Sequence, residues 1–134
     1  METIDFVKKS HYRLETYKGR EKFVRILIKE YIINLQKVVM YDEGISNVVF
    51  KDSHGPRLIF NKTDENYRMS KELKFVLCFQ LALQSLEYAY AEIINKEYIN
   101  PVGKDWWKDK YASSTYYRNR TLAINNLVEN YQYE

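Results

Sequence analysis

A chain of 134 residues with 46% apolar residues is long enough to bury the core of one compact domain. Only four Gly and two Pro interrupt it, and 29% of its residues are charged, which excludes collagen-like and disordered chains and favours long helices. The chain has a single cysteine, Cys78, so an intrachain disulfide is excluded, and we expect Cys78 to be a small residue of the core. Since no apolar run approaches the roughly 18–20 residues of a membrane span, and METIDFVKKSHY resembles no signal peptide, we expect a cytoplasmic protein.

The net charge of +3 permits an anionic partner without requiring one. Its distribution is more informative, because residues 1–40 carry nine Lys and Arg against five Asp and Glu, and residues 104–120 carry five against two. Thirteen tyrosines are an unusual number, and aromatic rings with one polar edge suit interfaces. Two basic segments therefore flank a near-neutral middle.

The first third of the chain predicts two helices. Residues 3–17 favour a short helix that Lys18-Gly19 would end, because glycine readily adopts the left-handed conformation found at helix ends. Residues 20–39 predict a longer amphipathic helix. Its expected inner face is Phe23, Ile26, Ile28, Tyr31, Ile32, Leu35 and Val38.

Residues 41–67 are the irregular part, rich in Asn, Asp, Ser, Gly and Pro. The β-prone runs NVVF and RLIF, separated by KDSHGP, favour a small hairpin in the 46–60 region. His54 falls in the predicted turn. Because His11 is the only other histidine, too few ligands exist for a metal site, and we expect no metal or cofactor.

The next segment predicts a buried helix. Ser70 is a suitable helix cap, and the run KELKFVLCFQLALQSL is apolar on nearly every side, which is typical of a central helix surrounded by others. Residues 86–98 continue the helical pattern with Leu86, Ala89, Ile93 and Ile94 inward. Asn100-Pro101-Val102-Gly103 then opposes continuation.

The last segment has the outline of a helix-turn-helix. GKDWWKDKY, residues 103–111, predicts a helix of about two turns, Ala112-Ser113 a tight turn, and residues 113–131 a long helix. On this helix Tyr116, Ala123, Leu127 and Tyr131 share one face. Ser114, Tyr117, Arg118 and Thr121 lie on the opposite face.

Such a helix suits DNA recognition, because its first turns present hydroxyl and cationic groups while its inner stripe is held by neighbours. Arg118 fits a guanine or a phosphate, and the hydroxyls fit phosphate oxygens. The predicted DNA-binding residues are Ser114, Thr115, Tyr117, Arg118, Arg120, Thr121, Lys104, Lys108 and Lys110.

The stretch STYYRNRTLAINNL resembles the closing helix of sigma-factor region 4 and, more closely, of phage late-gene activators of the RinA, ArpU and LtrC kind. The resemblance covers roughly residues 70–131. It implies a phage or mobile-element regulator that binds promoter double-stranded DNA and engages RNA polymerase. The chain departs from the family in two places. DWWKDKY differs from the sequence that the family has in the preceding helix, and Thr121, Asn125 and Asn126 stand where the family carries basic residues.

Together these patterns predict a mostly α fold with a C-terminal helix-turn-helix, in which residues 1–67 and residues 68–134 form one compact unit. A second hypothesis is a protein-interaction module that modulates a regulator or self-associates as a homodimer through its tyrosine-rich surface. An enzyme is disfavoured, because the carboxylate pairs Glu87/Glu92 and Asp105/Asp109 have no nearby histidine and the chain has no glycine-rich phosphate loop.

Overall fold

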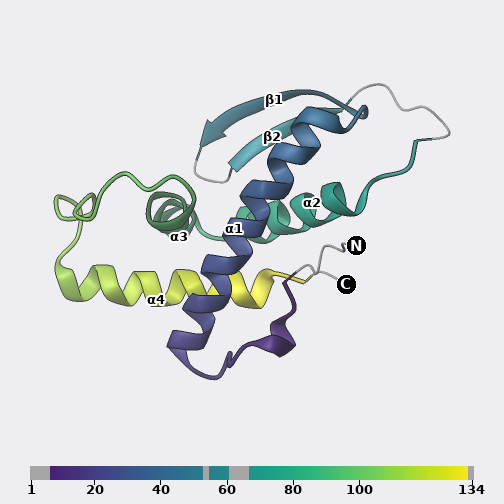
Figure 1. The fold of residues 1–134 in the computed structure, drawn as a ribbon. Helices are drawn as coiled ribbons and strands as arrows, with labels where there is room; N and C mark the ends of the chain where they lie inside the picture. The colour runs from purple at the N-terminus through teal and green to yellow at the C-terminus, as the bar shows by residue number, and fades with distance from the viewer. Residues whose placement is uncertain (1–6, 53–54, 61–66, 133–134) are drawn as a thin grey trace.

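The computed structural model describes residues 7–52, 55–60 and 67–132, and it is mostly helical with one β-hairpin, as the sequence predicts (Figure 1). The elements in chain order are η1 (Lys9–His11), α1 (Tyr17–Tyr41), β1 (Ile45–Asp52), β2 (Gly55–Phe60), α2 (Lys71–Gln84), α3 (Tyr88–Ile94), η2 (Asn95–Ile99) and α4 (Ser113–Asn130). Here η1 is a turn of 3-10 helix and η2 a turn of π-helix.

Helix α1 begins earlier than predicted. The hydroxyl of Thr16 caps it by accepting a hydrogen bond from the Gly19 amide at 3.0 Å. Lys18 and Gly19 therefore lie in the first turn, and the prediction that they end a helix is wrong. A Cβ on Gly19 would lie 1.8 Å from the Arg13 carbonyl oxygen, so this glycine serves a close chain approach. Of the expected helix over 3–17, the described residues before Tyr17 form only the short helix η1.

The central helix is α1, which contacts α2, α4, β1 and η2. Figure 1 shows it running the length of the molecule, with the hairpin near one end and α4 crossing near the other. The prediction that α2 is central is wrong, since Leu81 of α2 is 67% exposed. The buried residues of α1 are Phe23, Val24, Leu27, Ile28, Tyr31, Asn34 and Val38. Three predicted core positions, Ile26, Ile32 and Leu35, are only half-buried.

The predicted hairpin is confirmed, with β1 and β2 antiparallel and Val48 opposite Leu58. A buried glutamine holds it to the helices. Gln80 of α2 donates hydrogen bonds to the Tyr31 hydroxyl at 3.1 Å and to the Pro56 carbonyl at 2.9 Å. Because buried polar groups need partners, these bonds fix where β2 sits over α2. The expectation for His54 lies outside the described residues.

After α2 the chain turns at Ser85 and restarts as α3, whose Ile93 and Ile94 are fully buried as predicted. The helix then widens into η2, where the Asn100 amide donates to the Asn95 carbonyl at 2.7 Å. This i to i−5 bond is the signature of a π-turn. The wider turn carries Glu97 and Tyr98, which contact α4 and α1.

The prediction of a two-turn helix over residues 103–111 is wrong. Residues 104–110 form consecutive turns, held by short-range bonds such as Lys110 amide to Trp107 carbonyl at 2.9 Å. Trp106 and Trp107 both contact the ring of Tyr116, with centroid distances of 5.7 and 4.3 Å. The turns therefore place both tryptophans against one ring of α4.

Candidate nucleic-acid interface

Helix α4 has the buried stripe that the sequence predicts. Tyr116, Ala123, Leu127 and Tyr131 are each at most 2% exposed, and the helix ends at Asn130. The stripe packs against α1, α2 and α3. Most of the helix is therefore fixed by burial of one side, since Ala112, at its cap position, makes no side-chain capping bond.

The opposite side of α4, which we call the outer flank, is Ser114, Tyr117, Arg118, Thr121 and Asn125. Ser114 and Arg118 are exposed, Tyr117 is 53% exposed, and Thr121 and Asn125 are half-buried. Thr121 donates its hydroxyl to the Tyr117 carbonyl at 3.0 Å, which leaves its oxygen able to accept. No described residue pairs with the Arg118 guanidinium. Thr115, also predicted to bind DNA, is half-buried beside this flank.

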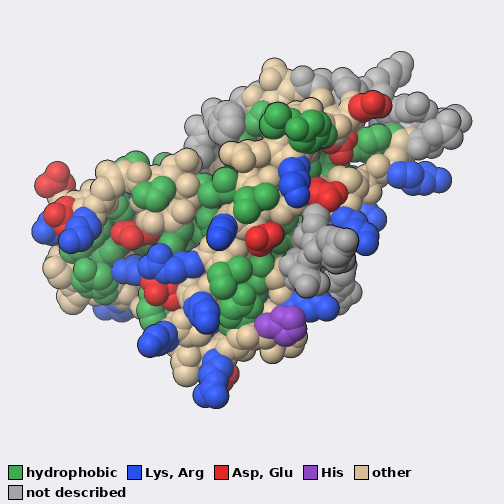
Figure 2. Space-filling view, viewed as in Figure 1, with side chains coloured by type: hydrophobic (Ala, Val, Ile, Leu, Met, Phe, Trp, Pro, Cys, Tyr) green, Lys and Arg blue, Asp and Glu red, His purple; other side chains and the backbone are tan. Residues whose placement is uncertain are grey.

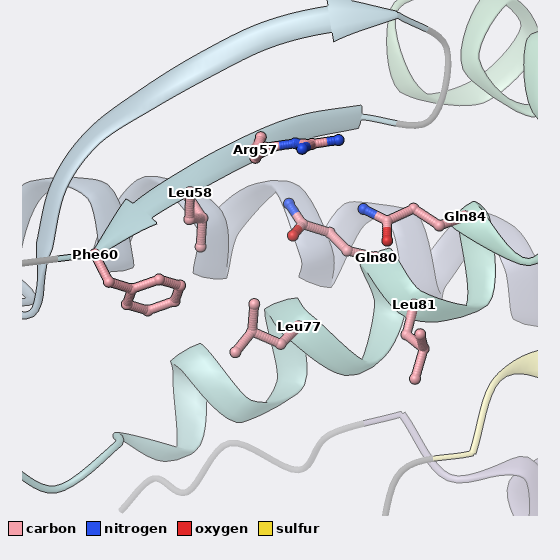
Figure 3. A pocket seen from close by; sticks show the side chains of 7 residues that line it. All are labelled: Arg57, Leu58, Phe60, Leu77, Gln80, Leu81 and Gln84. Carbon is pink, nitrogen blue, oxygen red and sulfur yellow. The ribbon is translucent and has the colours of Figure 1, made fainter.

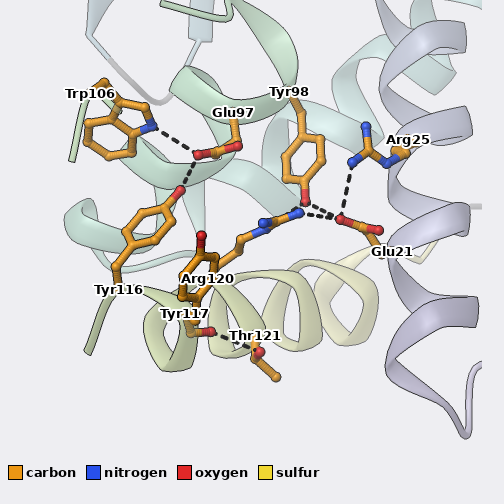
Figure 4. Close-up of polar contacts among 9 residues, drawn as sticks. All are labelled: Glu21, Arg25, Glu97, Tyr98, Trp106, Tyr116, Tyr117, Arg120 and Thr121. Carbon is orange, nitrogen blue, oxygen red and sulfur yellow. Dashed lines mark hydrogen bonds and ion pairs between the residues drawn. The ribbon is translucent and has the colours of Figure 1, made fainter. Parts of the chain in front are cut away.

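An aromatic clamp, formed by Trp106, Trp107 and Tyr116, holds the first turns of α4. The Trp107 and Tyr116 rings stack with an interplanar angle of 4°, and Trp106 meets Tyr116 edge-on at 87°. The Trp106 indole N–H donates to Glu97 at 3.1 Å, and the Tyr116 hydroxyl donates to the same carboxylate oxygen. Figure 4 shows both side chains converging on Glu97 of η2. The tryptophans are therefore structural.

Arg120 does not lie free beside the outer flank. Its Nε donates to the Tyr98 hydroxyl at 3.1 Å and its Nη2 to Glu21 at 2.5 Å (Figure 4). Tyr98 also donates to Glu21 at 2.9 Å, and Arg25 pairs with the same carboxylate at 3.2 Å. The Arg120 side chain is 21% exposed. Arg120 therefore links α4 to α1 and η2, and it does not lie in the position expected for a DNA contact.

The charges of this pair are stabilised by the surrounding groups. Burial would raise the pKa of Glu21, but hydrogen bonds from Tyr98 and Arg120 and the charge of Arg25 outweigh it and hold that pKa below its usual value. Burial opposes the charge of Arg120, yet Tyr98 and Glu21 raise its pKa. Both groups are therefore ionised at neutral pH.

The three lysines that were predicted to bind DNA differ in whether they form ion pairs within the protein. Lys110 donates to Glu92 at 2.9 Å, which binds α3 to the turn segment. Burial would raise the pKa of Glu92, but Lys110 and Lys96 together hold it below its usual value. Lys108 pairs with exposed Asp105 at 3.2 Å, and surface pairs of this kind are weak. Lys104 is exposed and has no ion pair with any described residue.

The predicted cations therefore separate into two groups. Lys104 and Arg118 remain available to a ligand, and Lys108 is loosely paired. Lys110 is engaged with the buried carboxylate of Glu92, and Arg120 with the half-buried carboxylate of Glu21. The sequence gives no signal for the partners Glu92 and Glu21, which lie 18 residues from Lys110 and 99 residues from Arg120.

Within the described ranges, no helix is long and apolar enough to cross a membrane. The same residues include no group of three or more His, Cys, Asp and Glu side chains placed to hold a metal ion. Cys78 is half-buried, and its Sγ lies 2.9 Å from the Gln132 carbonyl oxygen. Burial raises the pKa of this thiol, which disfavours the nucleophilic thiolate.

Comparison of the chain with protein-family models, with curated proteins and with solved structures finds no match. The resemblance to phage late-gene activators over residues 70–131 stays a prediction.

Proposed function

We propose that this chain is a sequence-specific DNA-binding transcriptional regulator that reads duplex DNA with the outer flank of α4. One observation supports this most directly: Arg118 and Tyr117 are exposed on a helix whose other side is fully buried. A rigid helix with an unpaired arginine on its open side has the geometry of a recognition helix.

In this proposal the first turns of α4 enter the major groove. Arg118 donates two hydrogen bonds to O6 and N7 of a guanine, the most common specific arginine contact. Ser114, Thr115 and Tyr117 donate to phosphate oxygens, and Lys104 adds a cation at the edge. Arg120 contributes indirectly, because its bonds to Glu21 and Tyr98 hold the helix in register. The expected setting is a cytoplasmic phage or mobile-element regulator that engages RNA polymerase.

The experiment is selection of a preferred site from a random duplex pool, followed by binding measurements on that site and on an unrelated duplex. Arg118→Ala is expected to weaken site binding by about 10- to 100-fold, the value of one bidentate base contact, and to reduce discrimination between the duplexes. Arg68→Ala, which removes an exposed arginine outside α4, is the matched control. Full discrimination in Arg118→Ala would reject the proposal.

A second candidate function, binding of a protein partner or a second copy, is favoured by an open groove between β2 and α2. Figure 3 shows Leu58 and Phe60 of β2 on the side of the groove across from Leu77 of α2, and Leu81 also lines the groove. The groove has a volume of about 540 Å³, and Phe60 and Leu81 are 44% and 67% exposed. Exposed apolar surfaces of this kind commonly mark protein contacts.

The two candidates respond differently to salt. Binding that neutralises phosphates weakens steeply as salt rises, whereas an apolar contact does not. A pull-down in increasing salt, with and without nuclease, separates them. Loss of the captured material in salt and nuclease supports DNA binding. Salt-resistant capture that Leu81→Lys abolishes supports the groove.

A further inference from the structure

A second cationic surface lies on α1. Lys18, Lys22, Arg25 and Lys29 follow one another at spacings of four, three and four residues, which places them on one face of the helix. All four are exposed. We call them the α1 row. Figure 2 shows lysine and arginine side chains spread over α1 on this face of the molecule.

The cations of the α1 row are largely free. Lys18, Lys22 and Lys29 have no ion pair with any described residue, and Arg25 stays 57% exposed although it pairs with Glu21. Glu21 is also engaged by Arg120 and Tyr98, so its charge is shared among several donors. The row therefore presents positive charge that the protein itself does not neutralise.

The chemistry of the row fits phosphates and not an apolar partner. Among the described residues, the exposed large apolar side chains of α1 begin at Ile33 and continue with Val39, Met40 and Tyr41. None lies between Lys18 and Lys29. A membrane-binding helix pairs its cations with an exposed apolar face, which this half of α1 lacks.

The row lies beside the crossing of α1 and α4. Arg25 of the row and Arg120 of α4 pair with the same Glu21 carboxylate, at 3.2 and 2.5 Å. Arg20 is two residues from both Lys18 and Lys22 and so lies on the opposite side of α1, where it donates to Asn125 of the outer flank at 2.6 Å. These bonds hold the row and α4 together as one rigid unit at this crossing.

We propose that the α1 row binds the phosphate backbone of the same duplex that α4 reads. This inference rests on the proposed function. From Lys18 to Lys29 the row spans about 16 Å at 1.5 Å per residue, a length of about five base steps at 3.4 Å each. Contacts of this kind orient the protein on DNA and carry no sequence information, so the row adds affinity and α4 supplies selectivity.

The test compares two triple variants with the same change in charge. Lys18→Gln, Lys22→Gln and Lys29→Gln together neutralise the row, and Arg68→Gln, Lys71→Gln and Lys74→Gln neutralise three exposed cations near the start of α2. Fluorescence anisotropy over a salt titration gives the slope of log affinity against log salt. The row variant is expected to lower the size of that slope by about 2–3, while the control leaves it unchanged.

The row variant is also expected to weaken the selected site and an unrelated duplex by the same factor. Glutamine favours helix, so thermal melts of both triples are expected to match the wild type. Equal slopes in the two triples would overturn the inference. Wild-type binding to phosphatidylserine vesicles without binding to duplex would overturn it as well.

The Arg118→Ala variant separates this inference from the proposed function. If it loses discrimination while the row variant keeps the wild-type slope, phosphate binding by the α1 row is rejected and base recognition by α4 is retained. If the row variant loses slope while Arg118→Ala discriminates fully, the reading by α4 is rejected and the row stands. A wild type that binds no duplex rejects both.

Discussion

Arg118 and Arg120 are two residues apart on α4 and have opposite surroundings. Arg118 is exposed and has no partner among the described residues, whereas Arg120 is 21% exposed and bonded to Glu21 and Tyr98. Residues i and i+2 of an α-helix point in directions about 200° apart, so Arg118 points to solvent and Arg120 to the neighbouring helices. Residue type alone therefore cannot identify a binding side chain; its helical phase must be known.

The same contrast holds for Tyr116 and Tyr117. Tyr116 is 1% exposed in the aromatic clamp, and its neighbour is 53% exposed. Each matched pair gives a direct test of the division between an inner side that stabilises the fold and an outer flank that is open to a ligand.

The largest effect is expected from Tyr116→Ala. It removes a buried ring stacked on Trp107 and a hydrogen bond to Glu97, and large-to-small changes of buried aromatics cost about 3–5 kcal/mol. Urea denaturation would measure this loss as a lower midpoint with an unchanged slope. A loss below about 1 kcal/mol would show that the clamp does not hold α4.

Arg120→Ala is expected to be next, at about 2–3 kcal/mol. Glu21 would keep Arg25 and Tyr98 but lose its partly buried partner, and an under-compensated carboxylate is costly. Arg118→Ala, the matched control, is expected to change stability by no more than about 0.5 kcal/mol. Equal losses in the two variants would contradict the assignment of Arg120 to the fold.

Parts of this division are predictable from the sequence. The spacing of Tyr116, Ala123, Leu127 and Tyr131 correctly predicts which side of α4 is buried, because a 3.6-residue period is a local property. The fate of Arg120 is not predictable in this way, since Glu21 lies 99 residues earlier and η2 is an unusual turn.

Two other errors have the same origin. Helix propensity predicts a helix over residues 103–111, but contact of both tryptophans with Tyr116 overrides it. Glycine statistics predict a helix end at Gly19, but the Thr16 cap and the close approach of Arg13 place it inside α1. In each case a tertiary or capping contact outweighs a local preference.

The stability that the contacts on the inner side of α4 provide should also depend on pH. The folded-state pKa of Glu21 lies below its usual value, so its contribution to stability is present above about pH 4.3, the unfolded value, and is lost as pH falls through the folded pKa. Glu21→Gln is expected to cost about 1–2 kcal/mol at pH 7, the range for hydrogen bonds to charged groups. Thermal melts from pH 7 to pH 3 should show this difference shrinking below about pH 4. A constant difference would mean that the Glu21 charge is unimportant.

Tyr117→Ala is expected to have the smallest effect on stability, below about 1 kcal/mol. Its ring touches Trp107 and Tyr116 only edge-on, with centroid distances of 5.7 and 5.4 Å, and alanine favours the helix. Duplex affinity is nevertheless expected to fall, because the lost hydroxyl faces the proposed ligand. Urea denaturation and anisotropy on one preparation would measure both quantities. If Tyr117→Ala destabilised the chain as much as Tyr116→Ala does, the outer flank would be part of the packed interior, and α4 would have no open side with which to read DNA.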